Sequence, residues 1–85
     1  MAKINEKDLL DEIRYDIKVK DSLKARLVLA SLENVSKKAQ KQALFSVSQA
    51  DDDFSIPLLA GFISNYPKVA GSYPHLKETV FQDTG

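Results

Sequence analysis

Apolar residues along this chain recur at intervals of three and four positions, the spacing that gathers side chains on one face of an α-helix. The pattern first predicts a helix over residues 5–17, where Asn5 is a good capping residue. Lys18 and Lys20 follow, where positive charge suits the end of a helix dipole. The apolar stripe of this helix consists of Leu9, Leu10, Ile13 and Ile17.

The same periodicity predicts four further helices, separated by short turns. Neither Gly nor Pro occurs among the first fifty residues, and strands would need such residues in the turns between them. Pro67 and Gly71 predict a loop before the last helix. The four helices are expected over residues 22–34, 36–50, 53–66 (with a first residue between 53 and 57) and 72–82.

Two of these helices are expected to pack closely in the core. The second, capped by Asp21 or Ser22, has a wide apolar face made of Leu23, Leu27, Val28, Ala30, Leu32 and Val35. The third, capped by Ser36, has a narrow stripe of small residues: Ala39, Ala43, Val47 and Ala50. Because small side chains allow close approach, the third helix is expected to lie between its neighbours.

Three consecutive carboxylates, Asp51–Asp53, allow two interpretations, a metal site or the start of a helix. A calcium loop that began at Asp51 would need Gly at its sixth position and Glu at its twelfth, but Ile56 and Phe62 stand there. Carboxylates also suit the positive end of a helix dipole, and Pro57 is tolerated in a first turn. The sequence therefore predicts a helix start and no metal ligand.

The last helix is short and carries Leu76, Val80 and Phe81 as its apolar residues. A helix of that length depends on packing for its stability. No further element follows it in the sequence. Two expectations result: a second copy of the chain covers this face, or residues 1–85 are the N-terminal part of a longer chain.

Composition predicts one small soluble domain. The chain has 85 residues, no Cys, and equal numbers of acidic and basic residues, 12 of each. The absence of Cys excludes disulfides and thiolate ligands. The N-terminal residues are charged, and no apolar run reaches the ~18 residues of a spanning helix. We therefore expect a cytoplasmic protein with no membrane span.

Charge is unevenly distributed along the chain. Residues 18–41 hold seven basic and two acidic residues, a net charge of +5, whereas residues 1–17 and 42–85 carry −2 and −3. A basic middle segment can bind an acidic partner, anionic lipid or nucleic acid. It can also be an ordinary solvated surface that neighbouring helices balance. Aromatic residues do not alternate with the basic ones, which disfavours nucleic acid.

Phe45 follows a run of lysines on the third expected helix. The favoured interpretation is that it is buried against another helix as an ordinary core residue. Exposed beside Lys38 and Lys41, it would be a binding anchor of the aromatic-plus-basic kind. The candidate partner-binding residues are Lys37, Lys38, Lys41 and Phe45.

No pattern of catalytic residues is present. His75 is the single histidine, and Gly61, Gly71 and Gly85 are isolated rather than grouped in a phosphate-binding loop. Neither a His-Glu-x-x-His motif nor a Gly-x-Ser-x-Gly motif occurs. We therefore expect a protein that is not an enzyme and needs no cofactor.

Residues 32–63 resemble a HEAT-type repeat in the order of their parts. An apolar helix ends at Leu32, a short turn follows, and a basic helix carries Ala39 and Ala43. An acidic turn then precedes a helix that opens with the sequence SIPLL. The resemblance implies antiparallel helix pairs stacked as an α-solenoid, and a role as a protein-interaction scaffold.

The sequence therefore predicts an all-α domain of four or five short helices in antiparallel pairs, a right-handed HEAT-like stack. A compact helical bundle is the alternative. The expected function is a non-enzymatic protein-interaction or scaffold module, with bacterial signalling or regulation as its setting. The alternative function is a small helical DNA-binding or regulatory domain that uses residues 18–41.

Overall fold

The structure, a computed structural model, describes residues 5–82, with side chains as far as Val80. No strand occurs within these residues, and the predicted all-α class is confirmed. The chain forms one more α-helix than the four or five expected. The elements are α1 (Glu6–Lys18), α2 (Ser22–Ala30), the 3₁₀ turn η1 (Ser31–Asn34), α3 (Lys37–Ser48), α4 (Asp52–Asn65), α5 (Pro67–Gly71) and α6 (Pro74–Gln82).

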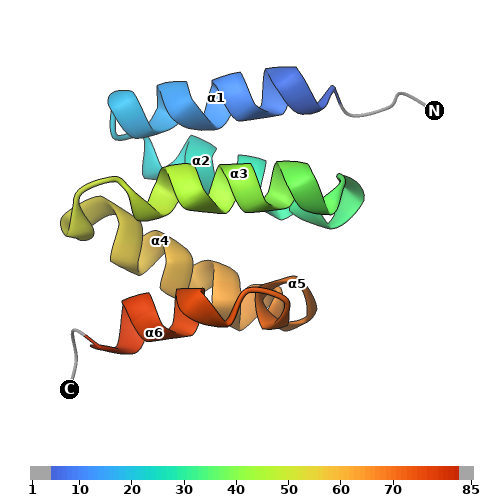
Figure 1. The fold of residues 1–85 in the computed structure, drawn as a ribbon. Helices are drawn as coiled ribbons and strands as arrows, with labels where there is room; N and C mark the ends of the chain where they lie inside the picture. The colour runs from blue at the N-terminus through green and yellow to red at the C-terminus, as the bar shows by residue number, and fades with distance from the viewer. Residues whose placement is uncertain (1–4, 83–85) are drawn as a thin grey trace.

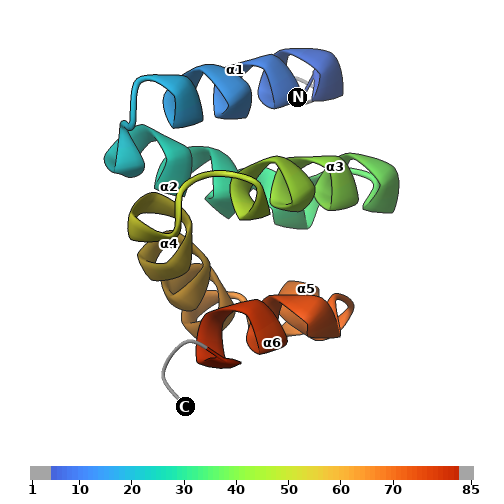
Figure 2. The same ribbon diagram turned by 60° about the vertical axis from the view of Figure 1, so that its left-hand side comes forward.

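The helices are stacked in two columns (Figures 1 and 2). Helices α1, α3 and α6 lie one below another and run in the same direction in Figure 1, while α2 and α4 run back. Helix α1 packs on α2 and α3, and α4 packs on α2, α3, α5 and α6. Helix α3 therefore lies between α1 and α4, and α4 joins the first three helices to α5 and α6.

Three side-chain caps set the first turns of α1, α2 and α3, as predicted. Asn5, Asp21 and Ser36 each accept a hydrogen bond from the backbone N–H three residues later, at 3.1–3.2 Å. These caps satisfy N–H groups that a helix leaves unpaired at its start. The local sequence alone therefore fixes where these three helices begin.

The turn between α1 and α2 depends on a left-handed residue, Lys20, which has a φ of 57°. The Lys20 N–H donates to the Ile17 carbonyl at 3.1 Å, and the Asp21 N–H donates to the Asp16 carbonyl at 2.8 Å. This pair of bonds is the Schellman motif, whose left-handed position is usually Gly. Because lysine has a side chain, the left-handed backbone conformation that this tight turn requires is energetically unfavourable at Lys20.

Helix α4 begins where the acidic run predicted a helix start. Asp51 is its cap residue, and the Asp51 carbonyl accepts from Phe54 and Ser55, but its side chain makes no capping bond. Pro57 is the sixth residue of α4 rather than part of its first turn, so that expectation was wrong. Pro57 and Asp53 are both exposed, so water can satisfy the Asp53 carbonyl that loses its partner.

Two other expectations about helix bounds need correction. The second helix ends at Ala30, and its last residues tighten into the 3₁₀ turn Ser31–Asn34. Such turns are frequent at helix ends. Residues 67–71, expected as a loop, form the short helix α5, because Pro67 at a first helical position is already in helical geometry.

One apolar cluster joins the helices, with α4 at its centre. Leu58, Leu59, Phe62 and Ile63 of α4 are buried in it, as are Leu76 and Val80 of α6, both as predicted. The Phe81 side chain lies outside the described residues. The expected burial of Leu23 and Leu27 is wrong, since they are 69% and 67% exposed. Val28 and Leu32 of the predicted face are buried, and α2 also turns Ala25 and Leu29 inward, which were not predicted.

The left-handed conformation at Lys20 makes a specific stability prediction. Replacing Lys20 with Gly removes the strain of a side chain at positive φ and stabilises the fold by about 0.5 to 1 kcal/mol. The change also removes the Lys20–Asp51 ion pair, 3.5 Å long and exposed at both ends, which contributes little. Urea unfolding measures the difference. Lys18→Gly, inside α1, is the matched control and should lower the free energy of unfolding. An equal decrease of this free energy in both variants would contradict the prediction.

Candidate partner-binding surface

Phe45 is exposed on the outer side of α3. Its side chain is 60% exposed, so it is not a core residue. Together with Lys38, Lys41 and Gln42 it lines an open pocket of about 440 Å³ whose exposed surface is mostly apolar. We call these four residues the Phe45 site. An exposed aromatic ring flanked by two ammonium groups is the arrangement that the sequence analysis named as a binding anchor.

Lys37 is the one predicted residue that does not line this pocket. It is exposed, and it is the first residue of α3, whereas Lys38, Lys41 and Phe45 share one face of the helix. The Lys37 carbonyl lies 3.1 Å from the Tyr73 hydroxyl. Gln42, which was not predicted, takes the fourth place in the pocket because it lies one turn beyond Lys38.

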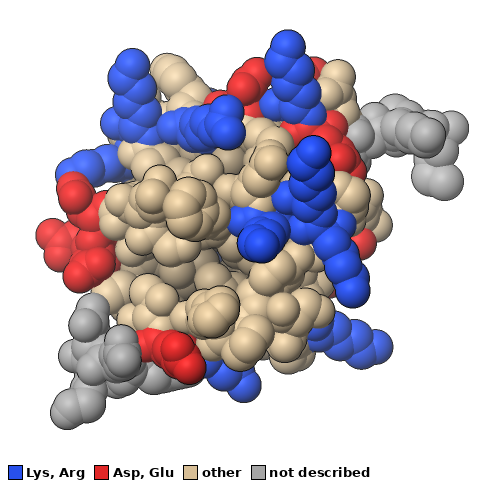
Figure 3. Space-filling view, viewed as in Figure 1, with Lys and Arg blue, Asp and Glu red and all other residues tan. Residues whose placement is uncertain are grey.

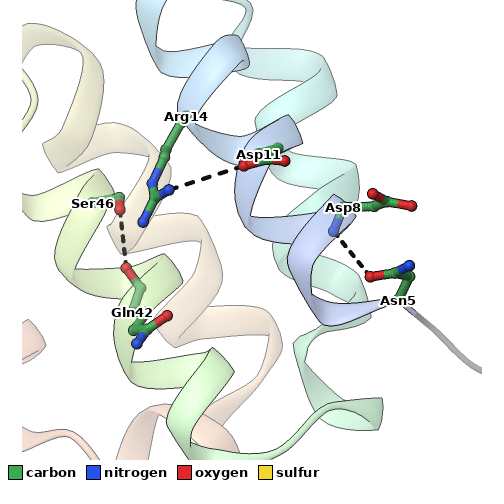
Figure 4. Close-up of polar contacts among 6 residues, drawn as sticks. All are labelled: Asn5, Asp8, Asp11, Arg14, Gln42 and Ser46. Atoms are coloured by element: carbon green, nitrogen blue, oxygen red, sulfur yellow. Dashed lines mark hydrogen bonds and ion pairs between the residues drawn. The ribbon is translucent and has the colours of Figure 1, made fainter.

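A second groove, of about 390 Å³, runs between α1 and α3 and shares Lys38 and Gln42 with the Phe45 site. Figure 4 shows Arg14 of α1 pointing toward Gln42 and Ser46 of α3, with Asp11 beside it. The Arg14–Asp11 pair is 3.9 Å long and exposed, so it holds Arg14 only loosely. The apolar pocket on α3 therefore continues into a groove whose lining includes charged side chains of both signs.

Basic side chains dominate this face of the molecule. Figure 3 shows Lys and Arg side chains over the middle and the top of the face, and Asp and Glu mainly at its left edge and upper right. The left edge corresponds to the turn between α3 and α4 in the same view. All seven basic residues of segment 18–41 are exposed, and two of them, Lys38 and Lys41, line the Phe45 site.

A further groove, missed in the sequence, lies between α1 and α2. It measures about 370 Å³. Buried Leu9 and Val28 contribute to its lining together with exposed Leu27, and Asp8 and Glu12 supply negative charge. We call it the acidic groove; its lining residues are Asn5, Asp8, Leu9, Glu12, Leu27, Val28 and Ser31. Because Leu27 was predicted to be a core residue, the sequence analysis did not predict this groove.

Contacts between distant segments hold α3, which carries the Phe45 site, in place. The Glu6 carboxylate accepts from the Ser36 backbone N–H at 2.7 Å and from the Ser36 hydroxyl at 2.9 Å. These bonds lower the pKa of Glu6. Buried Gln40 donates to the Leu32 carbonyl at 2.7 Å, and its Oε1 lies 3.0 Å from the Tyr73 hydroxyl. Helix α3 is thus tied to α1, η1 and the segment before α6.

Asp16 is a buried carboxylate that the sequence analysis did not anticipate. It is 2% exposed, and its Oδ2 has no hydrogen-bond partner among the described residues. Burial raises the pKa of Asp16; nearby Glu12 and Asp21 raise it further, and Lys24 opposes them. These groups lie on α1, at the start of α2, and in its first turn. Asp16 is therefore a strained structural group rather than part of the Phe45 site.

The other residues considered for chemistry lie apart. Asp51, Asp52 and Asp53 are exposed at the start of α4, and His75 is exposed at the start of α6. Within residues 5–82, no three carboxylate or histidine side chains meet as metal ligands would. The helices of that same span are too short or too polar to cross a bilayer.

Comparisons with known proteins find no matching family model, no matching curated protein and no matching solved structure. The likeness of residues 32–63 to a HEAT-type repeat therefore rests on the residues of this chain alone. The same holds for the partner-binding assignment of Lys37, Lys38, Lys41 and Phe45.

The Glu6 contact predicts a loss of stability on acidification. Because the pKa of Glu6 is lowered in the folded state, its contribution is present above about pH 4.3, the ordinary value, and is lost as pH falls through the folded-state value. Glu6→Gln therefore lowers the melting temperature at pH 7. The gap to the wild type closes on acidification. Glu33→Gln, at an exposed position, is the control. If it lowers the melting temperature as much as Glu6→Gln does, the Ser36 contact is not the cause.

Asp16 predicts the opposite pH dependence. Its pKa is raised, so its protonated form favours folding at low pH, and that contribution is lost as pH rises through the folded-state value. Asp16→Asn, which carries no charge, therefore raises the melting temperature at pH 7 by about 4 °C, as for a gain of about 1 kcal/mol. Scanning calorimetry at pH 3 and pH 7 measures it. Asp11→Asn, at an exposed position of the same helix, should change the melting temperature little. A lower melting temperature for Asp16→Asn would show that the charge of the Asp16 carboxylate stabilises the fold.

Proposed function

We propose that this chain is a non-enzymatic protein-interaction module whose partner docks on the Phe45 site. The observation that carries the proposal is the exposure of Phe45 on the same helix face as Lys38 and Lys41. Leaving a large aromatic side chain in water forgoes the free energy of burying it, and aromatic residues are enriched among those that dominate binding interfaces. Ammonium groups at the rim add selectivity for acidic partners. The proposed location is the cytoplasm.

The arrangement of the helices supports a scaffold of the HEAT-like kind. In such stacks each helix pair contacts only its neighbours, and the outer helix faces remain free for binding. Here α1 packs on α2 and α3, and α4 packs on α2, α3 and α6. The most extensive contacts are those of α1 with α2 and with α3, and that of α4 with α6. The compact bundle remains the alternative fold description.

The proposal predicts which substitutions abolish binding. Phe45→Ala, and separately Lys38→Glu/Lys41→Glu, should weaken capture of the native partner at least about tenfold while leaving the fold intact, because these side chains are exposed. The immobilised chain is used as bait in a lysate of its source cells. Retained proteins are quantified for the wild type and each variant.

Matched controls separate the Phe45 site from general surface effects. Leu23→Ala removes an apolar side chain about as exposed as Phe45, and Lys68→Glu/Lys77→Glu reverses two exposed charges on α5 and α6. Partners that wild type and both controls retain, and that both test variants lose, support the proposal. Partners retained equally by all variants rule out the Phe45 site.

A second candidate function is DNA binding or regulation through residues 18–41. The observation in its favour is the exposure of Lys37, Lys38 and Lys41 on one helix. Contacts to phosphate would make the affinity for random duplex DNA fall steeply with salt. Absence of binding at 20 mM salt, a concentration of about a tenth of the physiological value, would eliminate this candidate.

A further inference from the structure

The molecule carries two open apolar sites whose charges are opposite in sign. The Phe45 site presents an aromatic ring on the same helix face as Lys38 and Lys41, and the acidic groove presents Leu27 beside Asp8 and Glu12. Their volumes are close, about 440 and 370 Å³. One site projects an exposed aromatic side chain, whereas the other has buried apolar residues in its lining. The two are complementary in chemistry.

We propose that the partner at the Phe45 site is a second copy of this chain, bound through its acidic groove. Phe45 of one copy enters the acidic groove of the next, and Lys38 and Lys41 lie against Asp8 and Glu12. This inference rests on the proposed function, because it names the partner of the same site. It differs from the expected self-association through the last helix, whose residues Leu76 and Val80 are already buried.

The spacing of the charges supports the match. Lys38 and Lys41 are three residues apart on α3, a rise of about 4.5 Å along the helix axis. Asp8 and Glu12 are four residues apart on α1, a rise of about 6 Å. Two ammonium groups on flexible stems therefore face two carboxylates at a similar separation. Since the net charge of the chain is zero, no overall repulsion opposes the approach of copies.

Both sites can be occupied in one molecule at the same time. The Phe45 site lies on α3 and the acidic groove lies between α1 and α2, so they share no residue. In Figure 4, Asp8 points away from the side of α1 on which Gln42 and Ser46 lie. Each copy can therefore bind one neighbour through its Phe45 site and a second neighbour through its acidic groove. This is a heterologous contact, which builds rings or open chains rather than a two-fold dimer.

The test is a mixing experiment with charge-reversed variants in analytical ultracentrifugation. The wild type should show an average mass that rises with concentration. Lys38→Glu/Lys41→Glu makes both sites of the chain acidic, and Asp8→Lys/Glu12→Lys makes both sites basic, so each variant alone stays monomeric. Mixed in equal amounts, the two variants should associate again into alternating oligomers, because each Phe45 site then meets a groove of opposite charge on the other variant. A chain with all four substitutions should associate again, because both sites have reversed their sign.

Three further variants keep the test falsifiable if charge reversal disturbs the fold. Leu27→Ser changes a side chain that is 67% exposed and should weaken self-association at least about tenfold, as should Phe45→Ala. Leu23→Ala, outside both sites, should leave it unchanged. Circular dichroism checks that each variant is helical.

The outcomes separate this inference from the proposed function. A wild type that is monomeric at all concentrations overturns the inference, as does a mixture of the two variants that stays monomeric. If such a chain still captures a lysate protein through Phe45, the proposed function stands without self-association. If neither occurs, both fail. Binding of an acidic peptide or of duplex DNA by a monomeric wild type would assign the Phe45 site to that other partner.

Discussion

The burial of α4 is the constraint on which the rest of the structure depends. This helix carries large apolar residues on most of its surface, and it lies against α2, α3, α5 and α6. A chain this short has little core, so one helix must supply much of it. Leu59, fully buried, stands at the centre of that contact. Around α4, the other helices need only one apolar face each, and their outer faces remain open to water.

The open faces are not uniformly polar, and this connects the fold with the proposed function. Phe45 on α3 and Leu23 and Leu27 on α2 are exposed although both helices bury their opposite sides fully. The core has no room for them because α4 and α1 already fill it. Exposed large apolar residues that occur next to grooves indicate interaction surfaces. The proposed interaction surfaces therefore lie on the same helices that build the core.

Local signals in the sequence were sufficient to predict most of the helices. Side-chain caps such as Asn5 and Ser36 act within one turn, so they can be read without knowing the fold. Which face of a helix turns inward depends on its neighbours, and for α2 the predicted face was too wide: it included exposed Leu23 and Leu27 as well as buried Val28. Lys20 was missed because its conformation follows from the angle between α1 and α2. Asp16 was missed because a carboxylate at a core position contradicts ordinary patterning.

Three of the four residues of the Phe45 site were predicted and Gln42 was not, and the sequence analysis chose burial for Phe45, which is exposed. That choice depended on where α1 and α4 pack on α3. The hydroxyl of Tyr73 adds one consequence. It has a single proton and two acceptors within reach, the Lys37 carbonyl and Gln40 Oε1. The Tyr73 hydroxyl therefore links the first turn of α3 to the segment that precedes α6. A displacement of α6 would therefore change the free energy of the first turn of α3, which carries Lys37 and Lys38, by about 1 kcal/mol, the contribution of one hydrogen bond.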